Sequence, residues 1–509
     1  MRIIHISDTH IGGEKHFNQE ALDHTLNEIN SGKYDLLIHT GDITQSGRPE
    51  QYEDAKKFLE KIEIPYIVIA GNHDKRSGGF SLFEEYVGSS NGVEEFGDSV
   101  VIYVDSGVPD SDIGRVGMIK FDMIKNSLNV YQQKPIKIVA LHHHTLPVPM
   151  AGRERNVLSN AGDLLELFLK SDVDLVLAGH RHHPNVHKVE DTVIVNAGTV
   201  SGEKTRHGDA NSYNVIEIDE EEVTVETRRI NNSVSVKNFP KRRRRIFSDF
   251  GKRELRIVHM SNTYISSVTE SQLPNTTKFR YTHFFNAVDT INDLEADLVV
   301  HSGGIVEEGI SRNYELAEKY LSRIEPPIVF TPSGRDINYL GYHLFQEYFG
   351  QMDQEYAEDD ILLRGISSAQ YDSPIGIIGE TERKELFKEL RKRDESFKGV
   401  FLHHNVIPIP HSREKGLLED AGNLLRDVVD EGIDLILTGT SSHPFAANVG
   451  DTVIANANAL SSVYQRSTYG NSFNIVDIYE NSIVISEITS LWGNRRLLGM
   501  WRRTDGGSS

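Results

Sequence analysis

Five short stretches in the first half of the chain place aspartate, asparagine and histidine directly after apolar runs. They contain Asp8-Thr9-His10, Gly41-Asp42, Gly71-Asn72-His73-Asp74, His142-His143-His144 and Gly179-His180-Arg181-His182. Carboxylate oxygens and imidazole nitrogens suit divalent metal ions. Two such ions about 3.5–4 Å apart can hold both the attacking and the leaving oxygen of a phosphoryl group. The residue types therefore predict a dinuclear centre that hydrolyses phosphate esters, with Asp42 bridging the two ions.

The elements that must position these residues are short buried strands. Residues 36–39 form a typical apolar strand that stops at a glycine before Asp42, and helical segments with one apolar face alternate with such strands. Ligands of α/β sheets lie beyond the carboxyl ends of the strands. After Gly97 the strands become shorter and more frequent. The sequence thus predicts an α/β fold in which two packed sheets are flanked by helices, an α/β/β/α sandwich.

The chain then repeats itself. Residues 255–264 repeat residues 1–10, and later segments follow in the same order: 299–304 for 37–42, 328–336 for 66–74, 402–405 for 141–144 and 435–444 for 175–184. So many ordered matches predict a tandem duplication. We expect an active domain at residues 1–240, a basic linker at 241–253, a second domain at 254–503 and a frayed tail at 504–509.

The second copy keeps the apolar pattern and loses most of the residues that could bind metal. The positions of Asp8, His10, Asp42, Asn72, His73, His180 and His182 hold Asn262, Tyr264, Gly304, Gly334, Arg335, Thr440 and Ser442. Only His403 and Asp336 match their counterparts. Without a bridging carboxylate no dinuclear centre can assemble. We therefore expect a folded but inactive copy with a structural or regulatory role, paired with the first half as an intramolecular pseudo-dimer.

Composition limits the location and the partners of the protein. The 509 residues carry a formal net charge of -21 and contain no cysteine, which excludes disulfides and thiolate sites. Met1 leads directly into a core strand and no run of about 18 apolar residues occurs, so we expect neither a signal peptide nor a membrane span. These features predict a cytoplasmic protein. The basic run at residues 241–245 is either a solvated linker or a contact for an anionic partner.

The ordered pattern D-x-H, G-D, G-N-H-D, H and G-H-x-H resembles the calcineurin-like metallophosphoesterase superfamily. The segment at residues 141–147 is most similar to its branch of cyclic-nucleotide and glycerophosphodiester phosphodiesterases. This resemblance implies two metal ions, manganese first, with iron or zinc as alternatives. One ion would be held by Asp8, His10, Asp42 and His182. The other would be held by Asp42, Asn72, His142 and His180.

The same resemblance implies roles for the residues around the metals. A hydroxide between the ions would be the nucleophile, His73 would contact the phosphate and protonate the leaving oxygen, and Asp74 would orient His73. His143 remains an alternative to His142 as a ligand. Arg153 and Arg155 follow the histidine run and are candidates for binding the substrate phosphate, with plain surface solvation as the alternative. We expect His5, His39, His183 and His187 to be structural.

The leading function is therefore a metal-dependent phosphodiesterase acting on a small or nucleotide substrate. A nuclease on RNA or DNA is the alternative among enzymes, although the chain is acidic and lacks the stripe of aromatic and basic residues that single strands need. A non-catalytic scaffold or regulatory subunit is the alternative outside enzymes. The complete ligand set of the first half argues against that last function.

Overall fold

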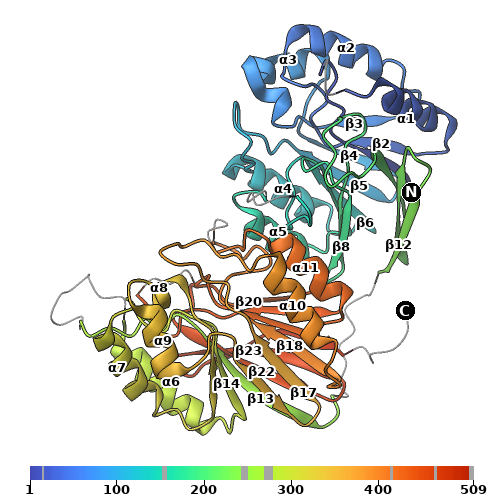
Figure 1. Ribbon diagram of the computed structural model, residues 1–509. Coiled ribbons are helices and arrows are strands. Elements are labelled where there is room, and N and C mark those ends of the chain that lie inside the picture. Colours follow the sequence, from blue (N-terminus) through green and yellow to red (C-terminus); the bar gives the residue numbers. More distant parts are fainter. Residues whose placement is uncertain are drawn as a thin grey trace. The chain divides into compact units, whose positions relative to one another are not determined.

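The computed structural model describes residues 1–13, 17–151, 157–241, 250–268, 279–412, 416–463 and 467–503 (Figure 1). The chain folds as two units, Met1–Arg245 and Ile246–Ser509. Their boundary lies within the stretch 241–253 that the sequence marks as a linker. Arg153, Arg155, most of the basic run and the tail at 504–509 lie outside the described residues.

The first unit contains two mixed six-stranded sheets. The first sheet has the order β12 (Val234–Pro240), β11 (Glu222–Arg229), β10 (Ser212–Ile218), β1 (Arg2–Ile6), β2 (Leu36–His39) and β3 (Tyr66–Val68). The other sheet has the order β8 (Asn185–Val189), β9 (Thr192–Asn196), β7 (Leu175–Ala178), β6 (Ile136–Leu141), β5 (Ser99–Val104) and β4 (Gly92–Phe96). β1, β2 and β3 run parallel, as do β5, β6, β7 and β9. The carboxyl ends of these strands therefore gather at one edge of each sheet.

The two sheets share a core, and helices cover the outer face of the first sheet. Ile3 and Leu36 of the first sheet pack in one cluster with Ile138 and Leu175 of the second. On the opposite face, Ile4 belongs to a cluster with residues of three helices: α1 (Gln19–Ser31), α2 (Pro49–Leu59) and α3 (Gly79–Tyr86). This alternation follows from the two-residue period of a strand. Helix α4 (Met118–Val130) packs on β5, and α5 (Ala161–Lys170) buries an apolar face. The predicted α/β class is confirmed, and both sheets are mixed.

The second unit has the same strand order. One sheet runs β15 (Ile328–Phe330), β14 (Leu298–His301), β13 (Arg253–Met260), β22 (Ser472–Tyr479), β23 (Ser482–Thr489) and β24 (Arg495–Arg502). The other runs β16 (Glu355–Glu358), β17 (Ile361–Gly365), β18 (Phe397–Phe401), β19 (Leu435–Thr438), β21 (Thr452–Asn456) and β20 (Phe445–Val449). Its helices are α6 (Tyr281–Asp293), α7 (Ser311–Leu321), α8 (Gly334–Ile337), α9 (Gly341–Phe349), α10 (Glu380–Leu390) and α11 (Ala421–Asp430). Even the register repeats, since Ile3 pairs with Leu36 and Ile257 pairs with Leu298.

In the part of the chain that the structure describes, every helix is too short or too polar to cross a bilayer.

Candidate metal centre

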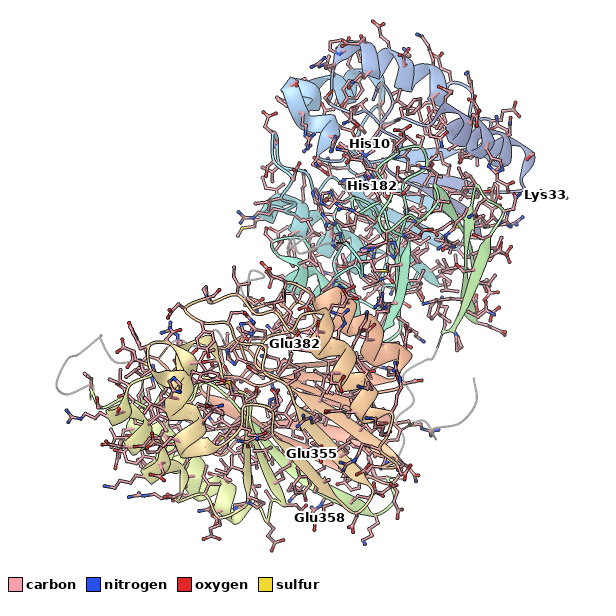
Figure 2. The ribbon with its side chains drawn as sticks, in the orientation of Figure 1. His10, Lys33, His182, Glu355, Glu358 and Glu382 are labelled. Atoms are coloured by element: carbon pink, nitrogen blue, oxygen red, sulfur yellow. The ribbon has the colours of Figure 1, made fainter. Side chains whose placement is uncertain are left out.

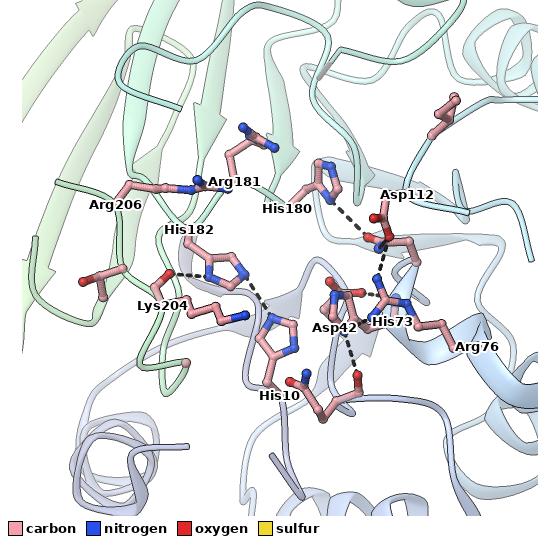
Figure 3. A pocket seen from close by; sticks show the side chains of 15 residues that line it. His10, Asp42, His73, Arg76, Asp112, His180, Arg181, His182, Lys204 and Arg206 are labelled. Atoms are coloured by element: carbon pink, nitrogen blue, oxygen red, sulfur yellow. Dashed lines mark hydrogen bonds and ion pairs between the residues drawn. The ribbon is translucent and has the colours of Figure 1, made fainter. Parts of the chain in front are cut away.

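The predicted ligands of the first unit follow strand ends and meet at one place. Asp8 comes just after β1, Asp42 after β2, Asn72 after β3, His142 after β6 and His180 after β7. A cavity of about 820 Å³ opens there (Figure 3). Its lining includes six of the predicted site residues: His10, Asp42, Asn72, His73, His180 and His182. The fold thus brings side chains from both sheets into one site.

Asp8, His10 and His182 form the first ligand cluster. Figure 2 labels its two histidines, His10 and His182. The Nε2 atoms of His10 and His182 are 3.0 Å apart. Asp8 Oδ1 lies 3.3 Å from the Nε2 of His182 and 3.8 Å from that of His10. This oxygen is fully buried and accepts no hydrogen bond from the described residues. An orphaned carboxylate oxygen facing two imidazole nitrogens fits a cation, because otherwise its burial would cost free energy.

Asn72, His142 and His180 form a second cluster, next to Asp42. Asn72 Oδ1 lies 3.1 Å from His142 Nε2 and 3.1 Å from His180 Nδ1. Asp42 Oδ2 lies 3.4 Å from His142 Nε2. Asp42 also forms a group of potential ligands with His10 and His73. It therefore lies between the two clusters, where a bridging carboxylate is needed.

Backbone carbonyls fix the orientation of two of these imidazoles. His142 donates from Nδ1 to the carbonyl of Thr40 at 2.7 Å, and His182 donates from Nδ1 to the carbonyl of Lys204 at 2.8 Å. Each bond leaves Nε2 as the ring nitrogen that faces the site. This is the usual arrangement of metal-binding histidines.

Electrostatics favour the ionised carboxylates that metals require. Burial alone would raise the pKa of Asp8, but His182 and His142 opposite it lower that pKa to about 2. Burial, together with the facing His182, lowers the pKa of His10 to about 3, so its ring is neutral. Burial lowers the pKa of His142, but the adjacent Asp42 carboxylate outweighs it and raises the pKa to about 9. A metal ion must therefore displace a proton from His142 when it binds.

Five of the seven predicted ligands adopt the left-handed backbone region. The φ angles are +56° at Asp8, +50° at His10, +56° at Asp42, +76° at His180 and +54° at His182. This region is uncommon for residues other than glycine and costs about 1–3 kcal/mol per residue. Asn262 and Tyr264, at the positions of Asp8 and His10, share this conformation with φ angles of +53° and +48°, so the fold retains it at these two positions without the metal ligands.

The orienting contact predicted for His73 comes from a different residue. His73 Nδ1 donates to the carbonyl of Gln45 at 2.6 Å. Asp74 is fully buried, and its carboxylate accepts from the backbone N–H groups of Ile43, Thr44 and Gly71 at 2.8–3.2 Å. Asp74 therefore ties together the backbone loops that carry Asp42 and Asn72, because its side chain points away from the His73 ring toward those loops.

The second unit supports a structural role for Asp74. Asp336 stands at the same position and accepts from the N–H groups of Gly304, Val306 and Ser333 at 2.7–2.9 Å. Tyr52 donates to the carbonyl of Asp74, as Tyr314 does to that of Asp336. Because the second unit keeps these contacts of the aspartate although its metal-ligand residues have been replaced, the contacts serve the fold.

The same comparison bears on the choice between His142 and His143. Although His143 forms a potential ligand group with His142 and His180, its Nδ1 pairs with Ser106 Oγ at 2.9 Å. His404 of the second unit pairs with Ser368 in the same way, also at 2.9 Å. His142 Nδ1 and His403 Nδ1 likewise pair with the carbonyls of Thr40 and Ser302, so this comparison leaves both His142 and His143 as candidate ligands. Two of the histidines expected to be structural contact buried hydroxyls: His5 pairs with Thr40 and His39 with Thr9.

Sequence patterns gave no signal for several residues of the site. Asp112 accepts from Asn72 Nδ2 at 2.9 Å and from Arg76 at 2.6 Å. The first of these bonds directs the amide oxygen of Asn72 toward the two histidines. Lys204 and Arg206 also line the cavity. None of these residues belongs to a strand-end motif, and Asp112 is 40 residues from Asn72 in the chain.

In the second unit, neighbouring atoms occupy the space that side chains would need at the positions of Asp42 and Asn72. A Cβ atom at Gly304 would lie 2.5 Å from Asn262 Oδ1 and 3.2 Å from the Tyr264 ring. A Cβ atom at Gly334 would lie 2.5 Å from the carbonyl oxygen of Ser373. These contacts leave no room for side chains at the positions of Asp42 and Asn72. Among the described residues, the groups that could hold a metal all lie in the first unit.

Comparisons with known proteins agree with this site. A probable cyclic nucleotide phosphodiesterase of Rhodococcus erythropolis is 31% identical over 196 residues, which cover 36% of this chain and 64% of that protein. A probable glycerophosphodiester phosphodiesterase of Arcobacter nitrofigilis is 27% identical over 217 residues, 40% of this chain and 79% of that protein. The DNA double-strand break repair protein Mre11 of Haloferax volcanii is 25% identical over 249 residues, 45% of this chain and 52% of that protein.

Among solved structures, a dimetal phosphatase from Danio rerio aligns with 48% of this chain and 99% of its own, with 9% identity and a TM-score of 0.40. The chain spans just under two thirds of the length of the Rhodococcus relative. A model of the calcineurin-like phosphoesterase family matches residues 1–184. This segment carries all seven proposed ligands, matches the calcineurin-like phosphoesterase family and is similar to cyclic-nucleotide and glycerophosphodiester phosphodiesterases.

Proposed function

We propose that the first unit is a metal-dependent phosphodiesterase that hydrolyses a small or nucleotide diester. The observation that carries this proposal is the convergence of seven ligand-type side chains on one place, with Asp42 between two clusters and five of the seven lining the cavity. The Rhodococcus and Arcobacter relatives are named as probable phosphodiesterases, which supports a diester as the substrate.

The donor set fits two divalent ions. Asp8, His10, Asp42 and His182 would hold one of them, and Asp42, Asn72, His142 and His180 the other. Mixed carboxylate, amide and imidazole donors suit manganese, iron or zinc, and we take manganese as the first choice. When bound, two such ions supply an activated water and neutralise the negative charge of the phosphate.

The side chains of the unit supply the remaining chemistry. Because His73 Nδ1 is engaged by the Gln45 carbonyl, Nε2 is the nitrogen free to give a proton to the leaving oxygen. Asp112 holds the Asn72 amide in place, and Asp74 holds the loops beneath the site. Asp74 is thus a positioning residue in this proposal.

The second unit, in this proposal, is a degenerate copy produced by tandem duplication. The identical strand order and the repeated contacts of Asp74 and Asp336 support a common origin. The filled positions at Gly304 and Gly334 support the loss of metal binding. We assign the domains to residues 1–240 and 254–503, and we assign the second a structural or regulatory role.

A nuclease is the second candidate, and one observation favours it. The Haloferax relative is a DNA repair protein that aligns over 249 residues. The acidic composition of the chain argues for the smaller substrate, because nucleic-acid binding depends strongly on cationic contacts to phosphates.

The test is a hydrolysis screen of the full chain with Mn²⁺. The screen contains phosphate monoesters, cyclic nucleotides, glycerophosphodiesters and short oligonucleotides, each assayed also after chelation. We expect metal-dependent turnover of small diesters. Turnover of monoesters alone, or undiminished turnover after exhaustive chelation, would refute the proposal.

A further inference from the structure

The cavity over the candidate metal centre is lined by two cations that have no side-chain partner among the described residues. Four cationic residues line it: Arg76, Arg181, Lys204 and Arg206. Arg76 pairs with Asp112 at 2.6 Å, and the buried Arg181 donates to the carbonyl of Ala151. The side chains of Lys204 and Arg206 make no hydrogen bond or ion pair with any described residue.

The segment that carries these two cations is held in place. The carbonyl of Lys204 accepts from Nδ1 of His182, a proposed metal ligand. The carbonyl of Arg206 accepts from the N–H of Asp209, whose carboxylate pairs with Arg229 of β11 at 2.7 Å. Lys204 and Arg206 therefore keep a fixed relation to the metal centre, because the same segment contacts one of its ligands.

Lys204 and Arg206 lie on the opposite side of the site from the proposed acid. In Figure 3 they are next to His182, while His73 and Arg76 are across the cavity. A diester has one negative charge at the scissile phosphate, which the metal centre neutralises. Lys204 is exposed and Arg206 is partly buried at this side of the cavity, so both charges are open to an anionic group that enters it.

We propose that Lys204 and Arg206 form a subsite for a second phosphate, so that the substrate is a phosphodiester carrying an additional phosphate group. A guanidinium can bind phosphate through two parallel hydrogen bonds, and a lysine adds a point charge. This inference rests on the proposed phosphodiesterase function and narrows its substrate. Cyclic mononucleotides, which have a single phosphate, would leave the subsite unused.

The test compares dinucleotides that differ only in a terminal phosphate. The full chain with Mn²⁺ is assayed on ApA and on the same compound with a 5′-terminal or a 3′-terminal phosphate. We expect kcat/KM to be at least about tenfold higher for one phosphorylated form, the effect of one or two charge-assisted hydrogen bonds. In the double variant Lys204→Gln and Arg206→Gln this ratio should fall close to one. Lys125→Gln, an exposed position on α4, serves as the matched control and should keep the ratio.

Two results would overturn the subsite: an equal kcat/KM for all three dinucleotides, or a preference that survives in the double variant. If the chain hydrolyses no diester at all, the proposed function fails, and dissociation constants of the same three compounds then decide. Tighter binding of a phosphorylated form that is lost in the double variant supports the subsite. Equal dissociation constants refute it.

Discussion

His10 and His182 are 172 residues apart in the chain, yet their Nε2 atoms lie 3.0 Å from each other. The Nε2 of His182 carries a lone pair, since its Nδ1 donates to the Lys204 carbonyl. Asp8 Oδ1 faces the same point and lacks a hydrogen bond from the described residues. A divalent ion placed there would satisfy all three atoms.

Replacement of the shared carboxylate should remove both metals and the activity. Asp42→Asn is expected to reduce hydrolysis of bis(p-nitrophenyl) phosphate to the level of the chelated wild type, because Asp42 lies between both ligand clusters. Mass spectrometry should give a metal content well below that of the wild type. Asp54→Asn, on the exposed face of α2, is the control and should change neither quantity. Near-normal turnover by Asp42→Asn after chelation would contradict the two-metal site.

His73 should act as an acid and leave metal binding intact. His73→Ala is expected to lower kcat by about 10²–10⁴-fold on substrates with poor leaving groups, and less on nitrophenyl esters. The metal content per chain should not change, because His73 Nδ1 is bonded to the Gln45 carbonyl and its ring lies beside the ligand clusters. A drop in metal content would instead make His73 a ligand, as its group with His10 and Asp42 allows.

Asp74 and Asp336 should have matching effects on stability. Removing either carboxylate leaves three buried backbone N–H groups without an acceptor, at a cost of about 1–3 kcal/mol for each group. We expect Asp74→Ala and Asp336→Ala each to lower the melting temperature of the full chain by several degrees. Calorimetry checks this. A variant Asp74→Ala with wild-type stability and no activity would restore the catalytic role that the sequence suggested.

A single carboxylate should not restore a metal centre in the second unit. Gly304→Asp places a Cβ 2.5 Å from Asn262 Oδ1 at a backbone φ of +74°. We expect a loss of about 1–3 kcal/mol in the free energy of unfolding, from overlap and strain. The metal content should stay at two ions per chain in the wild type and in this variant. Three or more ions in either protein would show that the second unit binds metal.

A buried histidine of the second unit should make the fold sensitive to acid. Burial lowers the pKa of His259 from 6.5 to about 3 in the folded protein. Between these two values the unfolded chain binds a proton that the folded chain does not, so the free energy of unfolding falls as the pH is lowered from 6.5 toward 3. His259→Gln removes the pH-dependent part of the free energy of unfolding that this histidine causes, which is on the order of a few kcal/mol.

The measurement is the free energy of unfolding in urea from pH 7 to pH 4. The destabilisation of His259→Gln relative to the wild type should shrink as the pH falls. His24→Gln, at an exposed position of α1, is the control and should show a constant difference. A difference independent of pH for His259→Gln would mean that the ring does not titrate in this window.

The amino-acid sequence by itself determined the α/β class and pointed to the residues that gather at the candidate site. Asp8, Asp42 and His142 could be named because each follows a short apolar run, and strand ends in an α/β sheet point to a common edge. The recurring apolar pattern of the second half and its replaced ligand residues were also readable, since both follow from residue type and period along the chain. Information of this kind is local, so one sequence contains it.

The tertiary structure decided which side chains meet. Sequence placed Asp74 beside His73, but packing turned its carboxylate toward the N–H groups of Ile43 and Thr44, 30 residues or more away. The adjacent histidines His142 and His143 have different neighbours, Asn72 for His142 and Ser106 for His143, which the sequence does not show. Lys204 and Arg206 belong to no motif and reach the cavity because the His182 ring is bonded to their segment. Contacts between segments distant in the chain depend on how the sheets pack, and a local pattern does not encode them.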